Sequence, residues 1–328
     1  MSTDKIQLFE RVGADEEHFV MLCKDLKNLS KKENKDLKFP YWISRKYDGI
    51  FCIAHKVRRG LVEIGSRTGE RYTSMKHIEQ ACDKIMATDT IMIFEAMIEK
   101  PQVLLEGETE TSVTFEKLNK ISGACRGSKQ APEIVAYVHD FLLYSEFCGL
   151  KTTPFAMRYS RVCLLHDVDH FEVVEQKYCP SLEAAKEMCK NILEIGGEGV
   201  VLTASASPYM FKGYRGLAKI KLKGTLSFDL RVLDVVEGKG KFKGTVGALR
   251  VEWFNDKTID ISGMCNAERD LWWLNKENIV GKIVEVEAMN KSPKGVLTQP
   301  RFKCIRFDKG DSDVDLNVDE GRIRCYEV

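Results

Sequence analysis

The sequence has no long apolar run, no excess of charge of one sign and no closely paired cysteines. Its 328 residues include 50 lysines and arginines against 49 aspartates and glutamates, a formal net charge of +1. That balance excludes a histone-like polyelectrolyte but permits local basic patches. The longest apolar stretches, such as Thr90–Ile98, are far too short to span a bilayer, and the charged N-terminus shows no secretory signal. With 44% hydrophobic and 30% charged residues, the chain is typical of a globular protein of about two domains, at roughly 150 residues each.

The eleven cysteines do not form a disulfide or zinc-binding pattern. They occur singly, with no C-x-x-C pair: Cys23, Cys52, Cys82, Cys125, Cys148, Cys163, Cys179, Cys189, Cys265, Cys304 and Cys325. Their number is odd, and a chain of this size does not need disulfides to be stable. We therefore expect free thiols, mostly buried, in a reducing compartment, and no zinc site.

The pattern of predicted helices and strands changes near residue 224. Before it, strand and helix patterns are mixed, at 41–64, 73–85, 90–98, 134–144, 155–165, 181–195 and 198–202. After Gly224, short strands separated by turn signals, with one helix near Ala267–Asn275, favour a small closed barrel. The expected domains are therefore 1–224 and 225–310, followed by an acidic tail at 311–328.

Two polar stretches interrupt the first of these domains. Residues 1–40 look partly helical and end in the lysine-rich Ser30–Lys38, which we expect to be a solvated connection. The segment Lys100–Pro132 is long enough to form an inserted hairpin or a mobile loop.

Several ionisable residues lie inside apolar strands. Glu95 and Asp140 are flanked by apolar residues on both sides, and Glu198 opens an apolar run. Burying an unpaired carboxylate is costly, so each must face a partner, a metal or a cavity, and a structural ion pair remains an alternative for each. In the strand 217–224, the side chains of Lys219, Lys221 and Lys223 must share one face because strands have a period of two. That face could also simply be solvated.

Taken with two further motifs, these residues suit a site for a nucleoside triphosphate. Lys46 and Asp48 occur in KYDG, whose glycine permits a close backbone approach to a ligand, and Arg67 follows Ser66 in SRTG. The set supplies an amine nucleophile, cations for phosphate and carboxylates for a divalent metal. The sequence contains neither a P-loop nor a Rossmann fingerprint, so phosphate would be bound in another way.

Six ordered motifs make the sequence resemble the covalent nucleotidyltransferase superfamily. They are KYDG (46–49), SRTG (66–69), FEAM (94–97), YVHDFL (137–142), EGVVL (198–202) and KLKGTLSFDLRV (221–232). The resemblance is greatest to ATP-dependent DNA ligases, and from about Tyr41 to Lys309 it covers nearly the whole chain. It implies an α+β fold: a nucleotidyltransferase domain (ATP-grasp-like) of antiparallel sheets with flanking helices, followed by an OB-fold β-barrel.

The resemblance also implies an enzyme that seals nicks between a 3′-hydroxyl and a 5′-phosphate in DNA, in replication, repair and recombination. Lys46 would attack the α-phosphorus of ATP and form a lysyl–AMP intermediate. The AMP would pass to the 5′-phosphate, and the 3′-hydroxyl would then displace it. Asp48 would support Lys46, and Lys221 and Lys223 would hold the α-phosphate; the pair Lys219/Lys221 is the alternative for that role.

The remaining site residues follow from the same resemblance. Besides Lys46, Lys221 and Lys223, ATP would be bound by Ser44, Arg67, Glu95, His139 and Glu198. Glu198 and Glu95 would hold Mg²⁺ or Mn²⁺. The residues expected to contact substrate DNA are Arg67, Lys241, Lys243, Arg301 and Arg306.

The sequence departs from the family pattern at three positions. Phe51 stands where the family has arginine in KxDGxR, and Thr298 stands where an arginine precedes the C-terminal aromatic. Arg301, Arg306 and Lys309 are then the candidates to orient pyrophosphate. His139 stands where the family has the ring that stacks on adenine; a hydrogen-bonded core histidine is the alternative.

Two other functional classes remain open at this point. An RNA ligase or a capping guanylyltransferase would share the lysyl–nucleotide step, and a non-catalytic OB-fold protein could use the barrel and the basic strand to bind nucleic acid. For the ligase, the expected partner is nicked double-stranded DNA, with no membrane and no obligate protein partner, and the enzyme should be monomeric. We expect it in the cytoplasm, or the host cytoplasm if its compact size reflects a phage origin.

Overall fold

The computed structural model describes residues 4–15, 17, 19–98, 118–195, 197–291, 296–315 and 321–325. The chain divides into two compact units, one of Met1–Lys223 with Val328 and one of Gly224–Glu327. No helix in the described part is long and apolar enough to cross a membrane.

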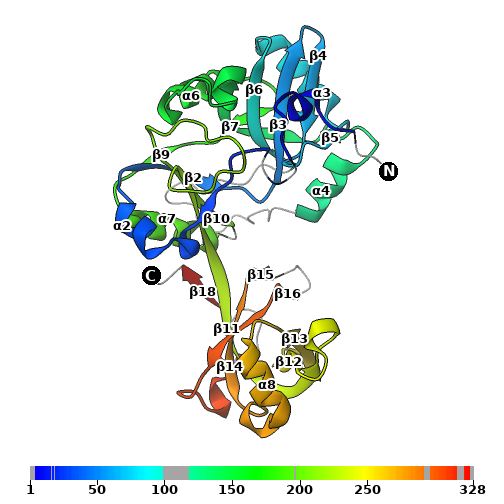
Figure 1. The fold of residues 1–328 in the computed structure, drawn as a ribbon, viewed down its shortest axis with the longest axis vertical. Coiled ribbons are helices and arrows are strands. Elements are labelled where there is room, and N and C mark those ends of the chain that lie inside the picture. Colours follow the sequence, from blue (N-terminus) through cyan, green and yellow to red (C-terminus); the bar gives the residue numbers. More distant parts are fainter. Residues whose placement is uncertain are drawn as a thin grey trace. The chain divides into compact units, whose positions relative to one another are not determined.

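The first unit contains two antiparallel-rich sheets (Figure 1). One has the order β5-β4-β3-β6-β7-β8, with strands β3 (Ile50–Arg58), β4 (Leu61–Gly65), β5 (Arg71–Tyr72), β6 (Thr90–Met97), β7 (Val135–Leu143) and β8 (Phe171–Val173). The other runs β9-β2-β10-β11-β1, with β1 (Lys24–Asp25), β2 (Tyr41–Lys46), β9 (Lys177–Cys179), β10 (Gly199–Thr203) and the first residues of β11 (Lys219–Glu237). We call them the six-stranded sheet and the lysine sheet.

The first unit also contains helices and 3₁₀ turns. They are α1 (Gln7–Arg11), α2 (Lys31–Asp36), α3 (Lys76–Ile85), α4 (Leu118–Arg126), α5 (Tyr144–Phe147), α6 (Phe155–Val162) and α7 (Leu182–Glu194), with 3₁₀ turns η1 (Leu26–Asn28) and η2 (Cys163–Leu165). Helix α7 packs on β10, β2 and β9, and its N-cap Ser181 accepts the backbone N–H of Ala184, as its sequence predicts.

Both faces of the six-stranded sheet are covered. Cys52, Ala54 and Phe94 belong to a core shared with α3 and α4, whereas Ile53 and Ile93 belong to a second core with the N-terminal residues. This alternation follows from the period of two along each strand. Because Phe51 and Glu95 are in register with the second set, their side chains lie on the face opposite α3 and α4.

The segment 100–132 differs from the expected hairpin or mobile loop. Residues 99–117 lie outside the described part of the chain. Leu118–Arg126 form α4, whose Ile121 and Cys125 are buried in the first core. The helix was missed because its few apolar residues are separated by polar and small ones.

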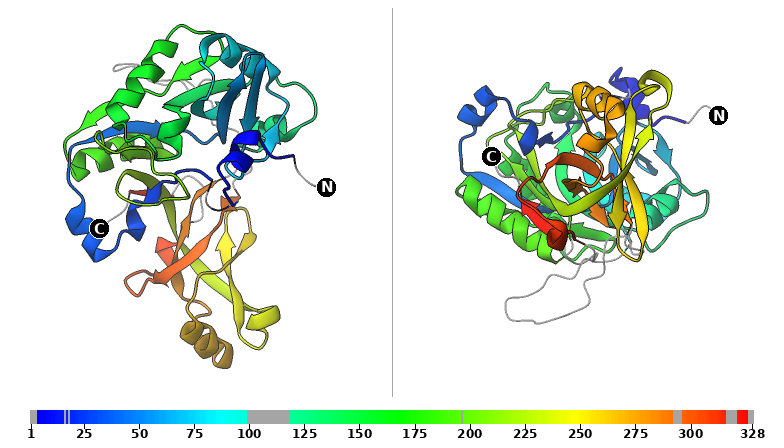
Figure 2. Two further views of the ribbon diagram at one scale, coloured as in Figure 1. Left: turned by 45° about the horizontal axis from the view of Figure 1, so that its top comes forward. Right: turned by 90° about the horizontal axis from the view of Figure 1, so that it is seen from below.

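The second unit is a closed barrel. Residues 226–231 of β11 pair with β14 (Ile283–Ala288), and residues 232–237 pair with β12 (Val246–Trp253). Strands β13 (Lys257–Ile261) and β17 (Arg301–Ile305) continue the order. A bridge between Ser262 and Arg301 joins the two ends. Helix α8 (Asn266–Leu274) lies at one end (Figures 1 and 2). Its Trp272 packs edge-on against Phe302 of β17.

Smaller elements complete this unit, and one of them corrects a boundary. They are β15 (Asn290–Lys291), β16 (Leu297–Thr298), β18 (Arg322–Cys325), and the 3₁₀ turns η3 (Gly240–Phe242), η4 (Lys276–Asn278) and η5 (Asp311–Asp313). The described residues of the expected acidic tail are not separate from the barrel, because β18 pairs with residues 224–227 of β11; residues 316–320 and 326–328 lie outside the described part of the chain. The buried carboxylate of Asp229 accounts for this, since it forms ion pairs with both Arg306 and Arg322.

Candidate active site

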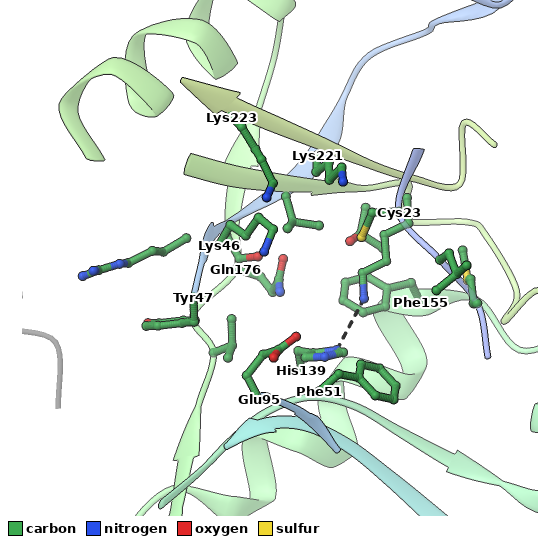
Figure 3. A pocket seen from close by; sticks show the side chains of 18 of the residues that line it. Cys23, Lys46, Tyr47, Phe51, Glu95, His139, Phe155, Gln176, Lys221 and Lys223 are labelled. Atoms are coloured by element: carbon green, nitrogen blue, oxygen red, sulfur yellow. Dashed lines mark hydrogen bonds between the residues drawn. The ribbon is translucent and has the colours of Figure 1, made fainter. Parts of the chain in front are cut away.

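A cavity in the first unit lies between facing strands of its two sheets. From the lysine sheet it is lined by Ser44 and Lys46 of β2 and by Lys219, Lys221 and Lys223 of β11. From the six-stranded sheet it is lined by Phe51 of β3, Glu95 of β6 and His139 of β7. Figure 3 shows Lys46, Lys221 and Lys223 on one side of the cavity and Glu95, Phe51 and His139 on the other. Arg67 and Val201 also line it, so the structure brings residues of all six motifs into one site.

Strand register explains how the lysines meet. Gly199 of β10 lies opposite Lys46 on one side and opposite Lys223 on the other, and Val201 lies between Ser44 and Lys221 in the same way. Gly199 has a φ of +141°, and a Cβ there would clash with the carbonyl oxygen of Leu222. Only glycine suits this position, because the backbone of β11 occupies the place where a Cβ would lie.

The Glu198 carboxylate bridges Lys46 and Lys223. Its Oε2 accepts a hydrogen bond from the Nζ of Lys46 at 2.5 Å, and its Oε1 accepts one from Lys223. Burial alone would raise the pKa of Glu198, but the two ammonium groups outweigh it and hold the pKa below its usual value. Burial likewise opposes the charge of Lys46, yet Glu198 and Glu95 keep the pKa of this lysine raised. The free site therefore holds Lys46 as an ammonium ion.

The other two carboxylates of the site are less easily ionised. Burial raises the pKa of Asp48, and the neighbouring charge of Glu198 raises it further. Burial also raises the pKa of Glu95, to about 7, despite the opposing effects of Lys46 and Arg67. Burial thus favours the neutral acid at both positions, whereas Glu198 stays ionised between its two lysines.

His139 is hydrogen-bonded to Lys219 at the wall of the cavity. The Nζ of Lys219 lies 3.4 Å from the Nδ1 of His139. Burial lowers the pKa of His139 well below its usual value, and the charges of Lys219 and Lys46 lower it further. A neutral imidazole that accepts at Nδ1 carries its proton on Nε2. The register of β6 and β7 shifts between Ile93 and Phe94, next to His139, and no sequence signal predicts that irregularity.

Phe51, which replaces an expected arginine, lies beside another arginine. The guanidinium carbon of Arg67 is 5.5 Å from the centre of the Phe51 ring, and both residues line the cavity. Arg67 therefore provides a cation close to the position where the family pattern has one.

Asp140 turns out to be a structural residue. Its side chain is buried and forms two hydrogen bonds with the Arg158 guanidinium, at 2.9 and 3.0 Å. Arg158 also donates to the backbone oxygens of Thr153 and Ser207. Of the alternatives considered for Asp140, the structure therefore shows the ion pair.

The residues of the second unit that are expected to contact DNA differ in exposure and in ion pairing. Lys241, Lys243 and Arg301 are exposed. Arg306 instead donates to Asp229 at 3.0 Å and to Asp308 at 2.7 Å. Two carboxylates thus hold its guanidinium, which favours a structural role; its assignment to DNA stays a prediction.

Sequence reasoning missed several residues of the cavity. They are Met21, Leu22, Cys23, Tyr47, Phe155, Gln176 and Arg215. Most come from loops or from the N-terminal segment, which carry no periodic pattern. The parallel pairing of the two-residue strand β1 with β11 places Cys23 here, and a strand so short leaves no recognisable pattern.

The carboxylates of the site can bind a divalent cation only if oxygens of the substrate supply further ligands. Among the described residues, no group of three or more histidine, cysteine, aspartate or glutamate side chains could hold a metal. Mg²⁺ is commonly held by one or two carboxylates together with phosphate oxygens and water. Glu198, with Glu95, matches that pattern when a nucleoside triphosphate is present.

Comparison with known proteins identifies the family. The family model described as ATP dependent DNA ligase domain matches residues 20–222, and the one described as DNA ligase OB-like domain matches residues 237–306. The chain belongs to the ATP-dependent DNA ligase family. This confirms the resemblance and the expected fold, including the OB-type barrel.

Individual relatives are distant. The chain is 29% identical over 263 residues to a DNA ligase of Methanopyrus kandleri, covering 71% of this chain and 46% of that protein. It is 27% identical over 302 residues to a DNA ligase of Methanothrix thermoacetophila, covering 82% and 52%. The chain thus spans about half the length of the curated relatives it matches.

Solved structures share the fold. The structure named Pmar-Lig aligns with a TM-score of 0.68 at 22% identity, over 88% of this chain and 68% of that one. A Lig E DNA ligase, described as DNA binding with a minimal scaffold, aligns with a TM-score of 0.61 at 20% identity, over 88% and 99%.

Proposed function

We propose that this protein is an ATP-dependent DNA ligase that seals nicks between a 3′-hydroxyl and a 5′-phosphate. One observation carries the proposal: in a cavity of the family's catalytic domain, Lys46 is bonded to Glu198 beside Lys221 and Lys223. A nucleophilic amine, a metal-binding carboxylate and two cations for phosphate are what nucleotidyl transfer needs.

The first step is assigned to Lys46. Its Nζ attacks the α-phosphorus of ATP, a phosphoramidate bond forms, and pyrophosphate leaves. Because the pKa of Lys46 is raised in the free site, attack requires that the ion pair with Glu198 loosens and that Lys46 loses a proton. Lys221 and Lys223 hold the α-phosphate and offset its developing charge, because they share the face of the sheet on which Lys46 lies.

The other groups bind and orient ATP. Glu95 accepts hydrogen bonds from the ribose, His139 stacks on adenine, and Ser44 and Arg67 contact the nucleotide. Asp48 supports Lys46, and Glu198, with Glu95, holds Mg²⁺ or Mn²⁺. When bound, the cation supplies positive charge against the phosphates. Of the two arginines considered as candidates to orient pyrophosphate, Arg301 is favoured because its side chain is exposed, whereas Arg306 is held by two carboxylates.

Two later steps complete the reaction. AMP passes from Lys46 to the 5′-phosphate of the nick, and the 3′-hydroxyl then displaces AMP and closes the strand. Nicked duplex DNA is the proposed partner, with Arg67, Lys241, Lys243 and Arg301 as contacts. We further propose that the enzyme acts as a monomer, without an obligate protein partner, in the cytoplasm where such DNA occurs.

A sealing assay with matched substrates tests the function. The purified chain, ATP and Mg²⁺ are incubated with a labelled DNA nick and with an RNA nick of the same sequence. The proposal predicts a sealed DNA product and a protein that has gained the mass of one AMP. An AMP adduct with sealing of the RNA nick alone would make the protein an RNA ligase, and labelling by GTP in preference to ATP would place it with capping enzymes.

A further inference from the structure

An exposed lysine-rich segment lies just ahead of the strand that carries Lys46. Residues 30–38 form α2 and its flanks, and Lys31, Lys32, Lys35 and Lys38 are all exposed. We call these four residues the α2 lysines. The helix itself buries no side chain, so packing in the core does not account for it.

Of the three carboxylates near the α2 lysines, Asp36 is exposed at the end of α2, and the other two are engaged elsewhere. Glu33 accepts the backbone N–H of Ser30 at 2.8 Å and pairs with Lys24 at 3.1 Å. Asp25 accepts the backbone N–H of Lys27 and lies 3.9 Å from the Nζ of Lys221. Within the described part of the chain, the α2 lysines form no ion pair, and they present four positive charges to solvent.

Their placement is unfavourable for the helix alone. Lys31 and Lys32 lie in the first turn, where the helix dipole favours acidic side chains. Lys31 and Lys35 are four residues apart, a spacing at which like charges repel. Glu33 in the first turn and Asp36, four residues after Lys32, offset part of this cost. The positive charge that remains is stabilised when the segment binds a polyanion.

The segment lies between two strands of the lysine sheet and is held at both ends. Before α2, strand β1 pairs with β11, and the side chains of Leu26 and Leu29 are buried. After α2, the ring of Phe39 packs edge-on against Tyr41 at 5.2 Å, and β2 then runs to Lys46. The α2 lysines therefore stand at a fixed place on the same unit that carries Lys46 and Lys221.

We propose that the α2 lysines bind the phosphate backbone of duplex DNA that flanks the nick. The inference rests on the proposed ligase function, because duplex DNA is the polyanion which that function brings to this unit. Contacts of this kind are independent of base sequence and release counterions, so they make affinity depend on salt. Each lysine that contacts phosphate contributes roughly 0.9 to the slope of log affinity against log salt.

The test compares three variants of the full chain. The first replaces the α2 lysines by glutamine (K31Q/K32Q/K35Q/K38Q), and the second replaces them by arginine. The matched control replaces four exposed lysines elsewhere on the first unit by glutamine (K76Q/K84Q/K129Q/K151Q). Affinity for a fluorescent nicked duplex is measured by anisotropy without ATP, from about 50 to 200 mM KCl, the range over which phosphate contacts change affinity strongly. Formation of the AMP adduct is measured separately.

The glutamine variant of the α2 lysines should lose up to about 3.6 from the salt slope, four contacts at roughly 0.9 each. The arginine variant should retain the slope, because guanidinium also neutralises phosphate. The adduct should form at the wild-type rate in all three, and its absence from the wild type would count against the ligase function instead. Three results would overturn the proposal. The control variant could lose as much slope as the glutamine variant, or the glutamine variant could keep the wild-type slope. When the same measurement is repeated with an RNA duplex, the loss could also be confined to RNA.

Discussion

The Nζ of Lys46 lies 2.5 Å from Oε2 of Glu198, while the other oxygen of the same carboxylate accepts from Lys223. One carboxylate thus holds both the proposed nucleophile and a proposed phosphate ligand before ATP arrives. The arrangement keeps two cations close together at little electrostatic cost, but it also keeps Lys46 protonated. Binding of ATP and release of this ion pair are therefore coupled in the proposed mechanism.

Removing the amine of Lys46 should abolish adduct formation. After incubation with ATP and Mg²⁺, the wild-type protein should gain the mass of one AMP, and Lys46→Ala should gain none. Lys46→Arg should fail as well, because a guanidinium stays protonated and cannot attack phosphorus. The wild-type adduct should be labile in acid, as a phosphoramidate is. Intact-mass spectra answer the question, and an adduct on the alanine variant would remove Lys46 from the mechanism.

Lys221→Ala and Lys223→Ala should each slow adenylylation by about 10²–10³-fold, the typical cost of losing one preorganised charge at a reacting centre. The rate of adduct formation at saturating ATP is the measurement. Lys219→Ala serves as the comparison, because its ammonium is bonded to His139 at another part of the cavity wall. If Lys219→Ala is the slower variant and Lys223→Ala is close to wild type, the phosphate ligands are Lys219 and Lys221.

Glu198→Ala should impair adenylylation through the metal, and excess Mn²⁺ or Mg²⁺ should restore part of the rate. The same substitution removes the charge that raises the pKa of Lys46. The rate of the rescued variant should therefore reach its plateau at a lower pH than the wild-type rate. A pH profile at high metal concentration checks both points; a variant that metal does not rescue and whose profile is unshifted would contradict them.

Local sequence patterns were sufficient to predict much of the fold and the lysines of the site. The period of two in β11 predicted that Lys219, Lys221 and Lys223 share a face, and all three line the cavity. The helical spacing at 73–85 and the cap at Ser181 gave α3 and α7 within a few residues. These features depend on neighbours in sequence, which is why they could be predicted.

Features that depend on distant partners could not be predicted. Asp140 looks like a site carboxylate until Arg158, 18 residues later, is seen beside it. Arg306 remains a predicted DNA contact, but the fold places its guanidinium on Asp229, 77 residues away. In both cases the carboxylate is buried, and sequence alone does not identify its partner.

The raised pKa of Glu95 predicts how stability depends on pH. The folded protein holds the pKa of Glu95 at about 7, above its value in the unfolded chain, because burial favours the neutral acid. Protonation thus supports folding fully below the unfolded pKa, and that support is lost as pH rises through about 7. Glu95→Gln, which is neutral at every pH, should raise the melting temperature at pH 8 and leave it nearly unchanged at pH 4. A Gln variant that is equally destabilised at both values would show that the carboxylate is needed for structure.

The contact between His139 and Lys219 offers a way to separate adenine recognition from core packing. If the imidazole stacks on the base, His139→Phe should preserve or tighten ATP use, because the larger ring recovers the contact, and His139→Ala should weaken it. Neither change should alter the melting temperature much, because Lys219 lines the cavity and can be hydrated when its acceptor is lost. If His139 serves the core instead, the phenylalanine variant leaves a polar partner without its hydrogen bond, at a cost of roughly 1–3 kcal/mol. Measuring the KM for ATP and the melting temperature on both variants distinguishes the two. A destabilised phenylalanine variant with unaltered ATP use would exclude stacking, and Lys219→Met, which removes the partner but not the ring, should then reproduce the destabilisation.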